Sequence, residues 1–92
     1  MMPVLDIRIE KSVMPNRFTR KQGQYLTFIH YYTKIHGCPP AEADMQRYFN
    51  VSPPSVHQMI LGLEARGLIA RAPGQPRSIR VLIPSDILPE LE

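Results

Sequence analysis

The chain has 92 residues, a formal net charge of +3 and one cysteine, Cys38. A chain of this length can bury one hydrophobic core, so we expect one compact domain. One cysteine cannot form an internal disulfide, no apolar run reaches the roughly 20 residues that cross a bilayer, and the first residues lack the pattern of a signal peptide. These features argue against a disulfide-stapled or membrane-spanning protein and predict a cytoplasmic location.

The basic residues are concentrated between Arg17 and Ile83, where nine lysines and arginines accompany only three acidic residues. The segment after Ile83 is acidic, with Asp86, Glu90 and Glu92. A basic body favours a polyanionic partner such as a nucleic acid. A solvated basic surface without a partner would have the same composition, so charge alone leaves both interpretations open.

Local signals predict a long first helix from Arg20 to His36. Thr19 and Gln22 have the spacing of a capping box, and the apolar residues that follow recur at helical spacing. Gly37 suits a C-terminal cap, and the Pro-Pro pair that follows it prevents the helix from continuing.

A second helix is predicted over Glu42 to Phe49, and Asn50 can adopt the left-handed conformation that ends it. Ser52 is a natural N-cap for a third helix, whose first turn tolerates Pro53 and Pro54 because N–H groups there have no helical partner. The third helix has one apolar stripe, formed by Val56, Met59, Ile60 and Leu63. Two helices separated by so short a turn indicate a helix-turn-helix.

Two short strands, Leu68 to Arg71 and Ile79 to Ile83, flank a seven-residue loop rich in proline and glycine after the third helix. Such a loop is too long for a tight two-residue turn and should extend from the body as a wing. The predicted fold class is therefore α+β, mainly α: a winged helix-turn-helix with three helices, a β-hairpin wing and an extra N-terminal β-strand.

The predicted organisation is an N-terminal extension over residues 1–16, a winged helix-turn-helix DNA-binding domain over 17–83 and an acidic tail over 84–92. Alternation of apolar and charged residues from Leu5 to Glu10 predicts the extra strand. This strand either pairs with its symmetry mate in a homodimer or joins its own hairpin, and the sequence leaves both alternatives open. The tail has too little pattern to predict a regular element, and disorder is one of its alternatives.

Five short motifs in the same order resemble the N-terminal DNA-binding domain of the LexA-type repressors. They are Phe18 to Gln22, Gly37 with Pro39-Pro40, Ser52-Pro53, Leu63 to Ile69, and the wing residues Gly74, Arg77, Ile79 and Arg80. The resemblance implies a winged helix-turn-helix and a sequence-specific, double-stranded DNA-binding transcriptional regulator acting as a repressor. LexA-type repressors dimerise and cleave themselves through a C-terminal serine-lysine peptidase domain, and in this respect we expect the chain to differ from them. We expect no self-cleavage from this chain.

In the resemblance, the family's base-reading positions fall on Ser52, Pro54, Ser55, His57 and Gln58. The serine is kept, whereas Pro54 replaces the family's asparagine and His57 and Gln58 replace its two glutamates. Glutamine can pair with adenine and histidine can donate to guanine, whereas glutamate accepts from cytosine. We therefore expect the third helix to enter the major groove of a sequence other than a LexA operator.

Phosphate contacts are expected from Arg20 and Lys21 at the start of the first helix and from Arg71 and Arg77 on the wing. A domain with so few such contacts binds DNA weakly by itself, so we expect a homodimer. Gly62 is unusual inside a helix, where glycine costs about 1 kcal/mol relative to alanine. A close approach of another backbone, from protein or DNA, would explain it.

We expect no enzyme, no catalytic residues and no cofactor or small-molecule ligand, since no nucleophile-base pair, carboxylate dyad or phosphate-cradling loop is present. His30, His36 and Cys38 offer no second pair, so we expect no metal site. The alternative function is a winged-helix protein-interaction module in which Met59, Leu61 and the N-terminal strand form the contact surface. The arginines of the wing favour DNA.

Overall fold

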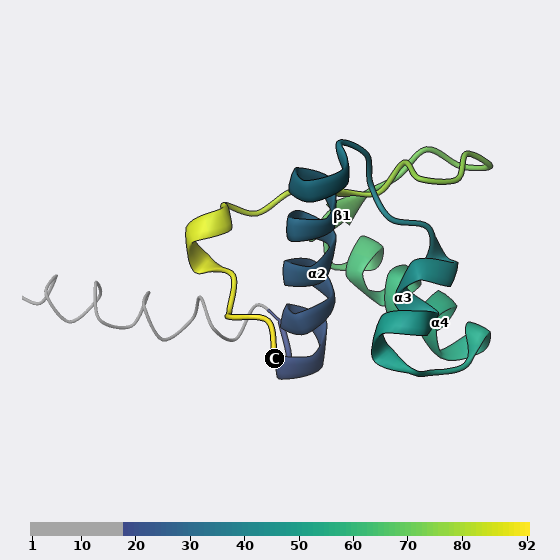
Figure 1. Cartoon of the computed structure of the whole chain (residues 1–92), viewed down its shortest axis with the longest axis horizontal. Helices are drawn as coiled ribbons and strands as arrows, with labels where there is room; N and C mark the ends of the chain where they lie inside the picture. The colour runs from purple at the N-terminus through teal and green to yellow at the C-terminus, as the bar shows by residue number, and fades with distance from the viewer. Residues whose placement is uncertain (1–17) are drawn as a thin grey trace, which may run out of the picture.

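The computed structural model describes residues 18–92. In chain order it contains α2 (Arg20–His36), α3 (Glu42–Phe49), α4 (Pro53–Ala65), β1 (Ile69–Ala70), β2 (Arg80–Val81) and a short 3-10 helix, η2 (Ser85–Ile87) (Figure 1). Within residues 18–92, three α-helices and an antiparallel hairpin make a winged helix-turn-helix, which confirms the predicted fold class for this part of the chain. The predicted strand Leu5 to Glu10 lies outside the described residues. Within residues 18–92, no helix is long and apolar enough to cross a membrane.

Helix α2 has the predicted bounds because adjacent residues set both of its ends. Thr19 Oγ1 accepts a hydrogen bond from the Gln22 N–H at 3.1 Å, and the Gln22 side chain accepts one from the Thr19 N–H at 2.9 Å. This is the predicted capping box. At the other end Gly37 has a φ of 78°, the left-handed conformation that stops a helix. The capping box holds Arg20 and Lys21 in the first turn of α2.

The turn between α3 and α4 also follows the prediction. Asn50 has a φ of 56°, and its N–H donates to the carbonyl of Gln46. The Ser52 side chain accepts from the Ser55 N–H, and two prolines occupy the first turn of α4. Asparagine tolerates the left-handed conformation better than most residues, which allows α3 and α4 to be joined by only three residues. The turn fixes the N-terminus of α4 relative to α3.

The hydrophobic core lies between the three helices and the hairpin. Val56, Ile60 and Leu63 from the predicted stripe are completely buried, and Met59 is half-buried. They pack with residues of the other elements, chiefly Leu26, Ile29, Met45, Leu68, Ile69 and Ile79. Burying each such side chain contributes roughly 1.5 to 3 kcal/mol. The core therefore fixes the rotation of α4 about its axis and decides which face stays outside.

The strands are shorter than predicted. Ile69 pairs with Val81 and Ala70 with Arg80, and a further bond from the Leu82 N–H to the Leu68 carbonyl continues the pairing at the base. Beyond β1 the chain bonds to itself instead: Ser78 Oγ accepts from the Ala72 N–H at 2.9 Å and donates to the Gln75 carbonyl at 2.8 Å. These bonds replace the strand ladder near the tip, and the hairpin extends away from α2 in Figure 1.

The acidic tail forms an ordered contact with α2, where the sequence offered no regular element and left disorder open. Thr27 Oγ1 donates to the Pro89 carbonyl at 2.8 Å, and the Gln24 side chain donates to the Glu90 carbonyl and accepts from the Glu92 N–H. Leu88 and Leu91 pack against the core. In Figure 1 the tail lies on one side of α2, with α3 and α4 on the other. The prediction missed this contact because its partners lie more than 60 residues apart in the chain.

Candidate nucleic-acid interface

The five residues predicted to read bases are all exposed at the N-terminal half of α4. They are Ser52, Pro54, Ser55, His57 and Gln58. Since successive helical residues are rotated by about 100°, Pro54 and Gln58 lie nearly opposite the buried Val56. His57 and Ser55 lie on opposite flanks of that outward face. The fold therefore brings the predicted residues together on one surface of the molecule.

The two serines are also part of the helix cap. Ser52 Oγ lies 3.3 Å from the Ser55 amide nitrogen, whose N–H it accepts, and 3.0 Å from Ser55 Oγ. A cap of this kind satisfies one of the N–H groups that the first helical turn leaves without a partner. Ser52 therefore has a structural role that limits its freedom to contact a base, whereas the Ser55 hydroxyl lies nearer to the outward face.

A shallow groove of about 530 Å³ runs along the Ser55 flank of α4 and reaches the first turn of α2. Its lining consists of Gln22, Pro54, Ser55, Gln58, Met59 and Gly62. A Cβ atom built on Gly62 would meet nothing within 4 Å. A close approach of another part of the described chain thus does not explain this glycine, and an approach by DNA or by a partner protein remains of the expected explanations.

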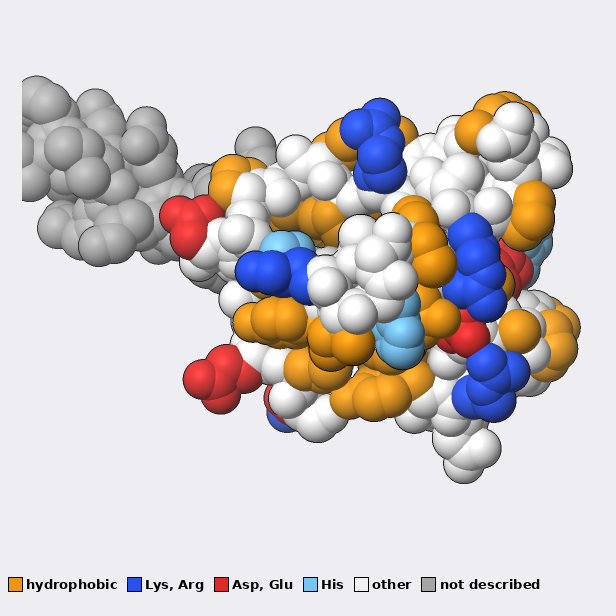
Figure 2. Space-filling view, turned by 45° about the horizontal axis from the view of Figure 1, so that its top comes forward, with side chains coloured by type: hydrophobic (Ala, Val, Ile, Leu, Met, Phe, Trp, Pro, Cys, Tyr) orange, Lys and Arg blue, Asp and Glu red, His pale blue; other side chains and the backbone are white. Residues whose placement is uncertain are grey.

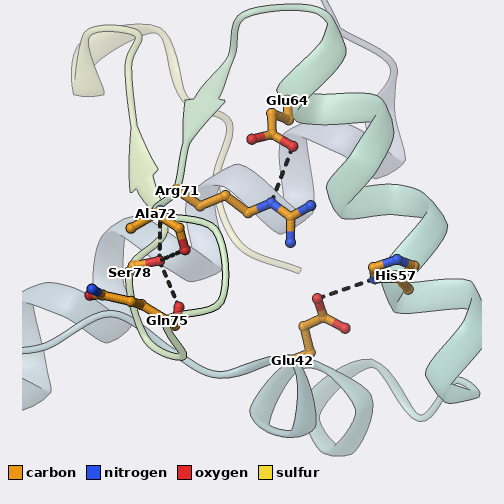
Figure 3. Close-up of polar contacts among 7 residues, drawn as sticks. All are labelled: Glu42, His57, Glu64, Arg71, Ala72, Gln75 and Ser78. Atoms are coloured by element: carbon orange, nitrogen blue, oxygen red, sulfur yellow. Dashed lines mark hydrogen bonds and ion pairs between the residues drawn. The ribbon is translucent and has the colours of Figure 1, made fainter.

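On the other flank, His57 faces α3. Its Nδ1 lies 3.4 Å from Oε2 of Glu42, the first residue of α3 (Figure 3). The side chain of His57 is 50% exposed and that of Glu42 is 34% exposed. Glu42 therefore lies directly beside a predicted base-reading residue, and no sequence pattern indicates this contact.

Three of the four predicted phosphate contacts already have carboxylate partners within the protein. Arg20 pairs with Glu92 at 2.6 Å, Arg71 with Glu64 at 3.1 Å and Arg77 with Asp44 at 3.0 Å. The fourth, Lys21, is exposed and has no ion-pair partner within the described part of the chain. On the face that Figure 2 shows, the basic side chains accordingly lie apart from one another, some of them close to acidic side chains.

The two wing arginines, Arg71 and Arg77, contact different parts of the protein. Arg71 is about one quarter exposed and extends from the end of β1 to Glu64 on α4, so it ties the hairpin to α4 (Figure 3). Arg77 has a φ of 57°, and its guanidinium also donates to Tyr32 Oη at 3.2 Å and to the Pro39 carbonyl at 3.3 Å. In this structure the Arg77 side chain is directed at α2 and α3 and serves the fold.

Asp44 is the carboxylate through which Arg77 attaches the wing to α3. Its carboxylate is 8% exposed, accepts from the Ala41 N–H at 2.8 Å, and pairs with Arg47 at 2.5 Å as well as with Arg77. The Ala41 N–H, followed by the charges of Arg77 and Arg47, lowers the pKa of this carboxyl, against the opposing effect of burial. Asp44 thus remains ionised at neutral pH and joins the start of α3 to the wing.

Of the contacts that Asp44 makes to Ala41 and Arg77, the sequence indicates only the first. Its position three residues after Ala41 suits a carboxylate that caps the start of α3, and that contact is local. The pairing with Arg77 joins residues 33 positions apart, and no periodicity or spacing rule predicts it. The same limitation applies to Glu42 beside His57.

One comparison with known proteins bears on this surface. The family model described as the LexA DNA binding domain matches residues 15–78, more than two thirds of the chain. The match includes α2, α3, α4, β1 and the wing loop and ends before β2, so it contains every residue on the outward face of α4.

Proposed function

Because the chain belongs to the LexA DNA-binding domain family and is a DNA-binding regulator, we propose that it recognises a specific double-stranded sequence by inserting α4 into the major groove. The observation that carries this proposal is the exposed polar surface at the start of α4, opposite its buried stripe. A recognition helix of a helix-turn-helix contacts base edges with its N-terminal residues. In this chain those residues are Ser52, Pro54, Ser55, His57 and Gln58.

Gln58 is the strongest candidate for direct base reading. It is exposed, lies nearly opposite Val56 and borders the open groove beside Gly62. Its amide offers a donor and an acceptor together, which matches the N6 and N7 edge of adenine. The unobstructed surface at Gly62 would let the DNA backbone come close to α4.

We assign phosphate contacts to Lys21 and Arg20 at the start of α2 and to Arg71 and Arg77 on the wing. For Arg20, Arg71 and Arg77 such a contact competes with the internal carboxylate that each now binds. An exposed ion pair contributes little, so the 81% exposed Arg20 can exchange Glu92 for a phosphate most readily. Lys21 faces no such competition from a described residue.

The regulatory outcome that we propose is repression by occupying a DNA site, with two copies bound to a two-fold site. A homodimer would double the number of phosphate contacts and raise affinity without changing the domain. The strand Leu5 to Glu10 is the proposed dimer contact, and it lies outside the described residues.

The test is a salt titration of binding to random duplex DNA, followed by selection of sites from a random pool. We expect the logarithm of the binding constant to fall steeply with the logarithm of salt concentration. Gln58→Ala should widen the range of sequences that are selected. Gln75→Ala, a matched change on the exposed wing loop, should leave that range unchanged. Absence of binding at low salt would refute the proposed function and favour the protein-interaction alternative.

A further inference from the structure

The contact between His57 and Glu42 determines what His57 can recognise. An ionised carboxylate has no hydrogen to donate, so when it shares a hydrogen bond with an imidazole nitrogen, the hydrogen belongs to the ring. Glu42 Oε2 faces Nδ1 of His57 at 3.4 Å. A neutral imidazole carries only one N–H, so with Nδ1 as the donor, Nε2 is an acceptor.

This assignment changes the base that His57 can recognise. Guanine offers N7 and O6 to the major groove, both of which are acceptors, as are the phosphate oxygens. An Nε2 without hydrogen cannot bond to any of them. The donors available in the major groove are the exocyclic amino groups, N6 of adenine and N4 of cytosine.

We propose that Glu42 fixes His57 as a hydrogen-bond acceptor, so that His57 reads the exocyclic amino group of adenine or cytosine in the major groove. This inference rests on the proposed function, because it assumes that α4 enters the groove. It makes Glu42 a positioning residue that touches His57, and it reverses the donation to guanine that the sequence predicts.

Geometry supports a positioning role for Glu42. Its backbone is held at the first residue of α3, and the Asn50 turn joins α3 to α4, so its side chain reaches His57 from the start of α3. Figure 3 shows the two side chains meeting across the space between the helices, with Arg71 held separately by Glu64. Half of the His57 side chain remains exposed for a partner.

The experiment uses the full 92-residue chain at about pH 8, above the usual titration range of histidine. A site is first selected from a random pool, and the base pair whose preference changes in His57→Ala marks the base that His57 reads. Synthetic duplexes then replace that adenine or cytosine by an analogue without the amino group, or the purine of the pair by its 7-deaza analogue. Each duplex is bound to wild type and to His57→Ala, so that any weakening of the base pair itself cancels.

We expect loss of the amino group to weaken binding about fivefold more in wild type than in His57→Ala, as for one hydrogen bond. Loss of purine N7 should give no such difference. Glu42→Gln should reduce the fivefold effect to less than about twofold, since an amide can donate as well as accept and no longer fixes the ring. Glu64→Gln is the matched control, because it also removes one carboxylate, 38% exposed, that pairs with a side chain near α4; it should keep the effect.

Four results would overturn the inference while leaving the proposed function intact. The first two are a difference that follows N7 instead of the amino group, and an amino-group effect that Glu42→Gln leaves at full size. The other two are equal losses in Glu42→Gln and Glu64→Gln, and a selected site that is the same for wild type and His57→Ala. A protein that binds no duplex at low salt would refute both proposals.

Discussion

The attachment at Asp44 makes a quantitative prediction, because one largely buried carboxylate joins α3 to the wing. Asp44→Ala removes the acceptor of the Ala41 N–H and leaves Arg77 without its carboxylate. A hydrogen bond to a charged group contributes about 1.5 to 3 kcal/mol, and loss of a helix-capping side chain costs about 0.5 to 2 kcal/mol. Both energies include the bond from the Ala41 N–H to Asp44, so they are not simply added. We expect the free energy of unfolding to fall by roughly 2 to 3 kcal/mol.

The expected change is large enough to measure in a domain of this size. A loss of 1 kcal/mol shifts the midpoint of thermal unfolding by about 4 to 8 °C in domains of 60 to 100 residues. Asp44→Ala should therefore lower the midpoint by at least about 8 °C, as followed by circular dichroism and confirmed by urea titration. Arg47→Met is the control, because the Arg47 side chain is 73% exposed and its pair with Asp44 joins neighbouring turns of one helix. This substitution should change stability by less than about 0.5 kcal/mol.

The dependence on pH separates the charge of Asp44 from its shape. Asp44→Asn keeps an oxygen that can accept from Ala41 but removes the charge that attracts Arg77 and Arg47. Because the pKa of Asp44 is lowered in the folded protein, its ionised form stabilises the fold above the unfolded pKa, and this stabilisation is lost as pH falls through the folded pKa. The stability difference between wild type and Asp44→Asn should thus be full at neutral pH and shrink below about pH 4. A difference that stays constant from neutral to strongly acidic pH would refute the electrostatic explanation, and an Asp44→Ala loss below about 0.5 kcal/mol would refute the attachment itself.

Two further predictions concern helix α2 and its tail. A Cβ on Gly23 would lie 3.0 Å from side-chain atoms of Phe18 and Pro89, so Gly23→Ala should destabilise the protein by about 1 to 3 kcal/mol. Gly62 has open space around it, so Gly62→Ala should stabilise the protein by up to about 1 kcal/mol. Urea unfolding compares the two variants, and a stability change of the same sign in both would contradict the packing described. Thr27 is completely buried and donates to the Pro89 carbonyl, so Thr27→Val should cost about 1 to 3 kcal/mol and increase hydrogen exchange at the Leu88 and Glu92 amides. If those amides exchange at the wild-type rate in Thr27→Val, the tail is held by its other contacts.

The helices were predictable because their ends depend on nearby residues. The Thr19 and Gln22 capping box, the left-handed Gly37 and Asn50, and the Ser52 cap each act within four residues, and all four occur where the sequence places them. The apolar stripe of α4 follows from helical spacing in the same way. The resemblance to the family agrees with this order of elements and added the expectation of a base-reading surface on α4.

The strands and the tail were less predictable because other parts of the chain compete for their backbone groups. The Ser78 hydroxyl binds backbone groups of Ala72 and Gln75, which are then not available to a longer hairpin ladder. Gln24 and Thr27 look like ordinary helical residues, and only the fold shows that their side chains bind the backbone of the tail.

By itself, the sequence determined the three helices, the turn between α3 and α4 and the outward position of Ser55, His57 and Gln58, since caps and helical periodicity act locally. Only the tertiary structure decided the partners of the charged groups. Arg77 is directed to Asp44, Arg71 to Glu64, and Glu42 meets His57. Ion pairs between distant residues depend on how the elements pack, and packing places a carboxylate beside a side chain that the sequence alone would leave free for DNA.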